Sequence, residues 1–484
     1  MSLGTVDYGL FGVVGGLTAF ISFFNTLLAG ALGRFYAYSI GKASVSTSSR
    51  SGLTECRRWF SIAVMVHTIV PTVLVTLGYG LGVWAVRNFL SIPAERISDC
   101  VVLFRLVCIS TFVGMVNVPF TAMYTAKQYI AELTLYSVVT TIANFLFIYH
   151  MVTTPGRWLV GYGVWMCCAS VVPQLIICVR AIQVFPECRF SLAYCFDRAR
   201  VRQLYGFSFW QMFGSLGWLV RAQGISIFVN KMFGPSVNAA MSVASSVNAH
   251  TSTLSAAMQG AFTPAITSAC GAGDDELMRK MAFRANRLGM LLAIVFILPC
   301  ALELPMVLVL WLKDPPEYAT MLCLAMMVSL VIDKSSLGQS IAVYAKGRMA
   351  LYQCVLGLAL IMALPIAMIF AYFHFGVFSV ALSLVVSACI CALGRVYFGR
   401  TLAGMSSRVW FTECFAPIVL VTIASGVVGC VPHLFMERSI LRIFVTAAAS
   451  ESAFALFCWL FVLPQGERTF VVERIRMMFR SRCQ

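Results

Sequence analysis

Charge is scarce in this chain of 484 residues: Asp, Glu, Lys and Arg together make up only 11%, whereas hydrophobic residues make up 60%. Soluble globular proteins carry roughly 25% charged residues, so this composition leaves too little polar surface to face water. In a bilayer, by contrast, an uncharged apolar run of about 20 residues spans the membrane as a helix, because its backbone polar groups are bonded internally. The scarcity of charge therefore excludes a soluble globular protein and favours an α-helical membrane protein.

Catalytic and metal-binding motifs are lacking as well. The 18 Cys residues include no CxxC pair, and the five His residues are far apart in the sequence, so neither a disulfide framework nor a metal site is indicated. The sequence contains no Walker phosphate loop, no HExxH and no GxSxG motif, and the loops between apolar runs are too short for a soluble catalytic domain. We therefore expect no enzymatic activity, no cofactor and no metal.

What the chain has in abundance is long apolar runs, which recur to its end and predict an all-α polytopic membrane protein. Thirteen runs are long enough to span a bilayer. They are Tyr8–Leu32, Trp59–Val86, Cys100–Tyr124, Leu133–His150, Trp158–Val179, Gly206–Asn230, Asn238–Ser268, Leu288–Leu312, Tyr318–Ala345, Leu351–Tyr372, Val377–Gly394, Trp410–Val431 and Ile443–Leu463.

The net charge of +16 follows the positive-inside rule. Most Lys and Arg residues fall in the loops after every second run and in the C-terminal tail, which the rule places in the cytoplasm. The loops on the opposite side hold only Arg87, Arg96, Arg157, Lys231, Lys313, Arg438 and Arg442. The basic excess therefore indicates topology, and no nucleic-acid partner is needed to explain it.

The predicted topology has an odd number of crossings. With the C-terminus in the cytoplasm, thirteen spans place the N-terminus outside, yet no signal peptide precedes it. A fourteenth helix before Met1 would return both termini to the cytoplasm, and we expect that such a first helix is missing here. The alternative is an authentic short N-terminus that is translocated unaided.

Several motifs, taken together, resemble those of bacterial polysaccharide flippases of the Wzx type, in the multidrug/oligosaccharidyl-lipid/polysaccharide exporter superfamily. The chain resembles this family without its first transmembrane helix. The motifs cover about residues 3 to 400 in order: "LGTVDYGLFGVVGG" at 3–16, Arg34, "GK" at 41–42, "IPAER" at 92–96, "VPFTAMYTAK" at 118–127, "FPECRF" at 185–190, "QGISIFVNKMFGPSVNAA" at 223–240, "LELPMVLVLWL" at 302–312, "PEYAT" at 316–320 and "AKGRMALYQ" at 345–353.

The resemblance implies two six-helix lobes facing each other across a central cavity, followed by two extra helices. On this chain it implies an N-lobe at 1–190 with five of its six helices, a cytoplasmic interfacial linker at 191–205, a C-lobe at 206–400, the extra helix pair at 401–463 and a basic cytoplasmic tail at 464–484. The segment "PECRFSLAYCFDRARVRQLY" mixes aromatic, aliphatic and basic residues, which predicts an interfacial helix that ties the lobes together.

One predicted span is unusually polar. Its Ser, Thr, Asn and Gln residues recur at spacings of three and four, so they share one helical face: Asn238, Ser242, Ser245, Asn248, Ser252, Ser255, Gln259 and Thr263. Such a face either lines a cavity or packs closely through small residues. The preceding span has Gln211, Ser215, Trp218 and Arg221 on one face, and the first has a weaker polar face that includes Asn25.

Ionisable residues inside predicted spans are candidates for function, because burying a charge in a bilayer is costly. Arg221 lies on a polar face, and its guanidinium suits bidentate contact with phosphate oxygens; the alternative is an internal ion pair with Glu303 or Asp333. Arg34, at the cytoplasmic end of the first span, either meets lipid headgroups at the cavity mouth or is an ordinary anchor. Glu303, Asp333 and Lys334 are candidates for ion coupling or for internal ion pairs.

The resemblance implies a flippase that moves a polyprenyl-pyrophosphate-linked oligosaccharide across the inner membrane for lipopolysaccharide or polysaccharide biosynthesis, by alternating access. Its expected partners are this substrate, membrane lipids and other polysaccharide-assembly membrane proteins. One alternative is a multidrug and toxin extrusion antiporter of the same superfamily. A membrane-embedded glycan polymerase or ligase is less favoured, because such enzymes usually need a larger outer loop.

Overall fold

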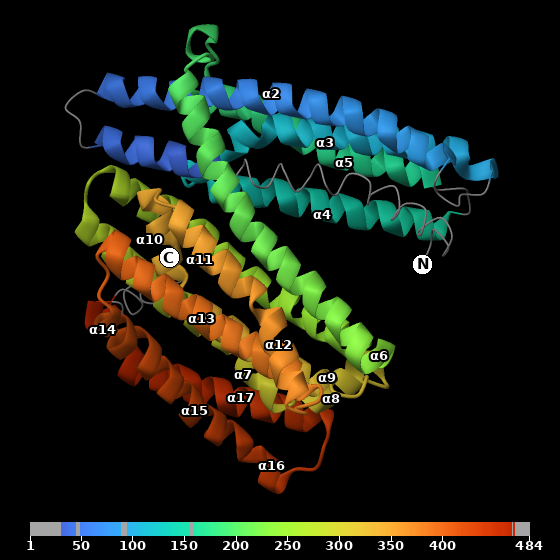
Figure 1. Cartoon of the computed structure of the whole chain (residues 1–484), viewed down its shortest axis with the longest axis vertical. Coiled ribbons are helices and arrows are strands. Elements are labelled where there is room, and N and C mark those ends of the chain that lie inside the picture. Colours follow the sequence, from blue (N-terminus) through green and yellow to red (C-terminus); the bar gives the residue numbers. More distant parts are fainter. Residues whose placement is uncertain (1–30, 45–48, 89–93, 155–158, 467, 470–484) are drawn as a thin grey trace, which may run out of the picture. The chain divides into compact units, whose positions relative to one another are not determined.

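The computed structural model describes residues 31–44, 49–88, 94–154, 159–466 and 468–469, and Figure 1 traces their helices. Within these ranges the chain is almost entirely helical and contains no β-strand. The predicted all-α class is thus confirmed. The first predicted span, Tyr8–Leu32, lies almost entirely outside the described residues, as does any helix before it.

Ten helices of the described part are long and apolar enough to cross a membrane, and α9 with α10 adds an eleventh if this bent pair counts as one span. In chain order they lie in α2 (Ser49–Asn88), α3 (Ile97–Ala126), α4 (Ile130–Thr153), α5 (Leu159–Val184), the first part of α6 (Arg198–Gly271), α7 (Asp275–Leu302), α9 (Ala319–Ser335) with α10 (Leu337–Lys346), α11 (Ala350–Ile361) with α12 (Ala363–Tyr372), α13 (Phe378–Ala403), α14 (Ser407–Val409) to α16 (Pro432–Phe435), and α17 (Ile440–Phe457).

The number of apolar spans differs from the thirteen predicted for two reasons. The first predicted span is not described, and the seventh, Asn238–Ser268, forms the second part of α6 but does not qualify as apolar. Because its hydroxyl and amide residues lower its hydropathy, this helix needs protein or water on its polar side. The predicted Leu288–Leu312 span ends in a separate short helix, α8 (Leu304–Leu312).

Helix α6 is two helices in sequence, divided at Gly234. The backbone of Gly234 has φ 87° and ψ 176°, a conformation that is open essentially only to glycine. Pro235 follows, and helix resumes through Gly271. The break thus separates the apolar part of α6, with Arg221, from the polar part, with Asn248.

The chain forms two compact units. The first comprises the described residues of Met1–Met212 together with Thr267–Asp274, and the second comprises those of Phe213–Ile266 and Asp275–Gln484. The predicted lobe limits at residues 190 and 206 lie on either side of the start of α6 at Arg198; the lobe ranges themselves stay predictions.

The core of the second unit is built by α6, α7, α9, α12 and α13. Its fully buried side chains include Ala244 of α6, Leu322 of α9 and Leu384 of α13. A second apolar cluster joins α7 to α15 (Ala416–Cys430) and α17, with Met290, Ile418 and Phe454 buried. The C-terminal helices therefore pack on α7 of the same unit through an apolar interface.

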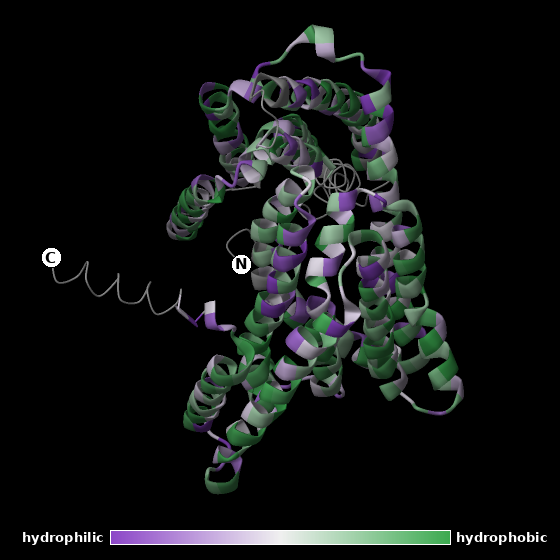
Figure 2. Cartoon of the chain, turned by 90° about the vertical axis from the view of Figure 1, so that its left-hand side faces the viewer, coloured by the Kyte–Doolittle hydropathy of each residue, from purple (hydrophilic) through white to green (hydrophobic). Residues whose placement is uncertain are grey.

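Many large apolar side chains remain exposed on the long helices. Helix α4 shows this most clearly, since Met151 is its one buried residue among those described, whereas Phe145 is 69% exposed. Figure 2 shows the helices mostly in the hydrophobic colour, with hydrophilic residues in the connections and on a few helix faces. In a polytopic protein these apolar surfaces face lipid.

The segment between α5 and α6 differs from the single interfacial helix that the sequence predicts. It contains two short 3₁₀ turns, η2 (Pro186–Cys188) and η3 (Leu192–Tyr194), joined by extended residues. Helix α6 begins only at Arg198, because the Asp197 side chain accepts hydrogen bonds from the backbone N–H groups of Ala199 and Arg200, a standard N-cap.

Candidate functional site

The span formed by α9 and α10 is broken at a cluster of charged residues. The two helices meet at an angle of 47°, and Asp333 and Lys334 lie in the last turn of α9. One carboxylate oxygen of Asp333 accepts from Arg395 Nη1 of α13 at 2.5 Å, and the other lies 3.1 Å from Lys334 Nζ. Asp333 is therefore neutralised by two cations.

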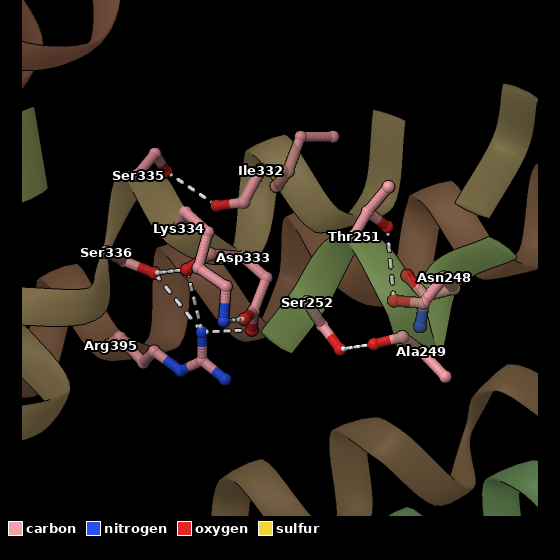
Figure 3. Close-up of polar contacts among 10 residues, drawn as sticks. All are labelled: Asn248, Ala249, Thr251, Ser252, Ile332, Asp333, Lys334, Ser335, Ser336 and Arg395. Atoms are coloured by element: carbon pink, nitrogen blue, oxygen red, sulfur yellow. Dashed lines mark hydrogen bonds and ion pairs between the residues drawn. The ribbon is translucent and has the colours of Figure 1, made fainter. Parts of the chain in front are cut away.

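The same break leaves backbone carbonyls without helical partners, and side chains from elsewhere satisfy them. Arg395 Nη1 also lies 3.2 Å from the carbonyl oxygen of Asp333, and Trp410 Nε1 donates to the carbonyl of Ser335 at 2.7 Å. Figure 3 shows Arg395 reaching the end of α9, with Ser336 beside it. The break is therefore a fixed structural feature, because side chains of α13 and of the segment after it satisfy its freed carbonyls.

Arg221 adds a further cation near this cluster. It lies on α6, is partly buried, and interacts electrostatically with Asp333 and Arg395. In the described part of the chain it has no hydrogen bond and no ion pair: Asp333 pairs with Arg395 and Lys334, and Glu303 pairs with Arg442. The cluster thus holds three cations and one anion, so an anionic ligand would balance it.

The second part of α6, residues 238–268, is called the polar helix here, and it packs on the core with its apolar side. Val237, Ala240, Met241 and Ala244 are buried, whereas Ser245 and Gln259 on the predicted polar face are exposed. Within its own unit the helix therefore packs mainly through its apolar side, and on the polar face Asn238 Oδ1 accepts from Ser226 Oγ at 3.0 Å. Figure 3 includes the part of this helix that bears Asn248 and Ser252 in the same view as the Asp333 cluster.

The hydroxyl groups of the polar helix bond mainly to their own backbone. Ser245 Oγ donates to the carbonyl of Met241 at 2.9 Å, and Ser252 Oγ donates to that of Ala249 at 2.9 Å. This satisfies the hydroxyl donor and leaves its oxygen free to accept. The side-chain amides of Asn248 and Gln259 have no hydrogen bond among the described residues, so they are available to a polar ligand or to water.

The remaining predicted site residues lie in varied surroundings. Gln211 belongs to the first unit, Trp218 is 61% exposed on α6, and Asn25 lies outside the described residues. Arg34, in the helical stretch 31–44, is buried, with its guanidinium 5.0 Å from the ring centre of Phe207. The structure thus brings Arg221 near Asp333 and Lys334, and it places Arg34 among aromatic rings.

Glu303 is held at the break between α7 and α8. Its carboxylate accepts from Arg442 Nε and Nη2, both at 2.9 Å, and from Thr446 Oγ1 at 2.9 Å, and His433 Nε2 lies 2.8 Å from it. Only 2% of Glu303 is exposed. This arrangement is a buried ion pair with additional donors, in which groups of the protein itself satisfy the carboxylate.

Sequence reasoning missed Arg395 and Arg442 as the partners of Asp333 and Glu303. The predicted span Val377–Gly394 stops one residue before Arg395, whereas α13 continues to Ala403. Arg442 was assigned to an outer loop, whereas it lies in the first turn of α17. The available signal was the presence of two acids inside predicted apolar runs, each of which favours a nearby cation.

The described residues contain no group of three His, Cys, Asp or Glu side chains placed to hold a metal ion. The guanidinium and ammonium groups of the Arg221 and Asp333 region can bind an anion.

Comparison with known proteins relates the chain to transporters through its structure alone. No family model matches the sequence, and no curated protein matches it either. Among solved structures, a MATE in complex with MaL6 is similar at 17% identity, covering 83% of this chain and 91% of that chain, with a TM-score of 0.65. An outward-facing multidrug resistance MATE family transporter of the MOP superfamily is similar at 15% identity, covering 83% and 89%, with a TM-score of 0.67.

A MOP superfamily transporter from Pyrococcus furiosus, described as having a binding pocket of reverse polarity that suggests a different function, is similar at 16% identity. The match covers 83% of this chain and 91% of that chain, with a TM-score of 0.64. At such identities the likeness concerns the fold and not the cargo. The chain therefore has the all-α, two-lobe exporter fold of MATE transporters in the MOP superfamily.

Proposed function

We propose that this protein is a flippase that translocates a polyprenyl-pyrophosphate-linked oligosaccharide across the inner membrane, with its C-terminus in the cytoplasm. The exporter fold supports membrane transport, and the motifs at residues 3–400 favour a lipid-linked glycan as the cargo. The observation on which the choice of cargo mainly rests is the surplus of positive charge around Arg221.

The unpaired Arg221 guanidinium favours a cargo with phosphate groups. Asp333 is already paired with Lys334 and Arg395, so the Arg221 guanidinium is left to meet another anion. A pyrophosphate crossing the apolar zone needs such a cation, and the planar guanidinium can contact two of its oxygens at once. The exposed polar face around Ser245 and Gln259 would hydrate or bind the glycan.

The proposed mechanism is alternating access, in which two lobes rock around a polar cavity and no covalent bond is made or broken. In this proposal Glu303 and Asp333 act as internal ion-pair partners and not as coupling sites, because each already contacts cations of the protein. The other proposed partners are membrane lipids and polysaccharide-assembly membrane proteins.

A multidrug antiporter is the second candidate, because a similar structure is described as a multidrug resistance MATE transporter. The two candidates differ in the charge of the cargo, since many drugs exported by antiporters would be cationic and would be repelled by the Arg221 region.

Purified protein in proteoliposomes can be offered a fluorescent lipid-linked oligosaccharide or a fluorescent organic cation. Movement of the organic cation alone would support the antiporter.

Substitution of Arg221 tests the cargo contact directly. We expect Arg221→Ala to abolish complementation of a flippase-null strain at near-normal protein abundance. Arg221→Lys should retain partial function, because the charge remains while the bidentate geometry is lost. Lys231→Ala, which removes an exposed cation from the same helix, is the matched control and should remain active. A fully active Arg221→Ala protein would refute the assigned contact.

A further inference from the structure

The segment between α5 and α6, residues 185–197, exposes large apolar side chains. Phe190 is 47% exposed, Leu192 is 71% exposed and Phe196 is 83% exposed. Outward-facing aromatic and aliphatic side chains in a short connection are unfavourable in water and indicate contact with another apolar phase.

The segment is nevertheless firmly attached to the first unit. Cys188 and Cys195 are buried, and the backbone N–H of Ser191 donates to Ser61 Oγ of α2 at 3.1 Å. Glu187 pairs with Lys127 at 2.6 Å. Its apolar side chains are thus presented outward on a fixed backbone, and Figure 1 shows this loop in green at the start of α6.

The depth of the segment in the membrane follows from its neighbours. It connects two spans, Val160–Val184 and Arg198–Gly234, so both its ends are at a membrane surface. Its contact at Ser61 lies two residues inside the apolar run Trp59–Val86, directly after the charged residues Arg57 and Arg58, which is about 3 Å along a helix. The segment therefore lies at the level of the headgroups and upper acyl chains.

Unpaired cations flank the exposed apolar side chains in the sequence. Arg189, Arg198 and Arg202 are exposed and have no ion pair in the part of the chain that the structure describes. The nearby acids are already paired within the protein: Glu187 contacts Lys127, and Asp197 contacts Arg200. An apolar surface edged by unpaired arginines fits anionic lipid, whose acyl chains and headgroups match the two features.

We propose that residues 185–202 form a lipid-binding anchor, in which Phe190, Leu192 and Phe196 insert into the cytoplasmic leaflet while Arg189, Arg198 and Arg202 bind anionic headgroups. The anchor fixes the start of α6 to the membrane surface. Its existence does not depend on which cargo the protein transports.

Photo-crosslinking of the full-length protein in its native membrane tests the location. A benzoylphenylalanine at position 196 should give lipid adducts that are detected by mass spectrometry, as should the same probe at Phe209, which is 54% exposed on the α6 span. The same probe at Glu276, exposed at the start of α7, is the aqueous control. A position-196 adduct with another protein or with a second copy of the chain, or recovery of unmodified protein, would overturn the anchor.

The headgroup preference requires a second measurement. In nanodiscs, replacing neutral phosphatidylcholine partly with phosphatidylglycerol should raise the Tm of the full chain, and a triple variant with Arg189→Gln, Arg198→Gln and Arg202→Gln should lose at least half of that rise. A control with Lys280→Gln, Arg348→Gln and Arg400→Gln removes as many exposed charges on the same predicted side and should keep the rise. Equal losses in both triple variants would show a general charge effect and refute a specific site.

Discussion

Arg442 of α17 donates two hydrogen bonds to Glu303, which lies 139 residues earlier at the break between α7 and α8. Glu303 is buried, and Thr446 donates a third hydrogen bond to its carboxylate. Because a buried carboxylate is stable only when it is paired and hydrogen-bonded, this contact holds the C-terminal helices to the broken end of α7.

Removing Arg442 alone should therefore destabilise the protein strongly. Arg442→Met leaves the Glu303 charge buried without its main partner, which costs about 3–5 kcal/mol. The loss should appear as a lower Tm and a lower abundance in detergent. Combining Arg442→Met with Glu303→Gln should restore most of the lost Tm and abundance. Arg438→Met, at an exposed position, should have little effect on either. No loss in the single Arg442 variant would contradict the stabilising role.

Cysteine accessibility should separate the two sides of the polar helix. In a cysteine-less background, Cys at Ser245, Ser252 or Gln259 should react with a small aqueous thiol reagent. Cys at Ala244, which is fully buried against the core, should be protected, and Cys at Val243 should react more slowly. Equal protection on both sides would mean that the polar face is closed by packing, and the cavity assignment would then be wrong.

The backbone at Gly234 predicts a specific cost for substitution. Gly234→Ala forces a side chain into a conformation reserved for glycine, at about 1–3 kcal/mol. Gly260→Ala is the matched control: it lies within the polar helix, where an added Cβ meets nothing within 4 Å, and alanine favours helix by about 0.5–1 kcal/mol. The measurement is the difference in Tm, and equal effects would contradict a strained break.

Cys188, outside the membrane spans, should stay protonated and unreactive in the folded protein. Its burial raises the pKa of the thiol above the ordinary value, and the nearby Glu187 carboxylate raises it further. As the pH rises past about 8.5, the unfolded chain therefore loses this proton first, and folded stability falls. Mass spectrometry should find Cys188 alkylated at alkaline pH only after unfolding, whereas Cys introduced at exposed Glu276, outside the proposed lipid anchor, should react at once. Rapid alkylation of native Cys188 would contradict its burial.

Much of the fold could be predicted from composition and periodicity. Apolar runs identify helices such as α4 and α13 because lipid allows few other structures. The polar face from Asn238 to Thr263 could be predicted from its three- and four-residue spacing, and the buried Ala240 and Ala244 lie off that face.

The long-range ion pairs could not be predicted in the same way. Arg395 and Asp333 are 62 residues apart, and nothing local in the sequence connects them. A charged residue indicates the end of an apolar run, so the predicted span Val377–Gly394 excludes Arg395, although α13 continues through it. Which cation meets which acid depends on helix packing, and packing is not encoded in hydropathy.

The hydrogen bond from Trp410 to Ser335 has a mechanical consequence. Trp410 begins the helical segment that leads to α15, and Arg442 lies in the first turn of α17. Helices α15 and α17 form a hairpin, and these two contacts hold it near its opposite ends. Because hydrogen bonds hold both of its ends, this hairpin cannot move independently of α7, α9 and α10. Any motion of the second unit must therefore move this hairpin together with α7 and α9 as one rigid body.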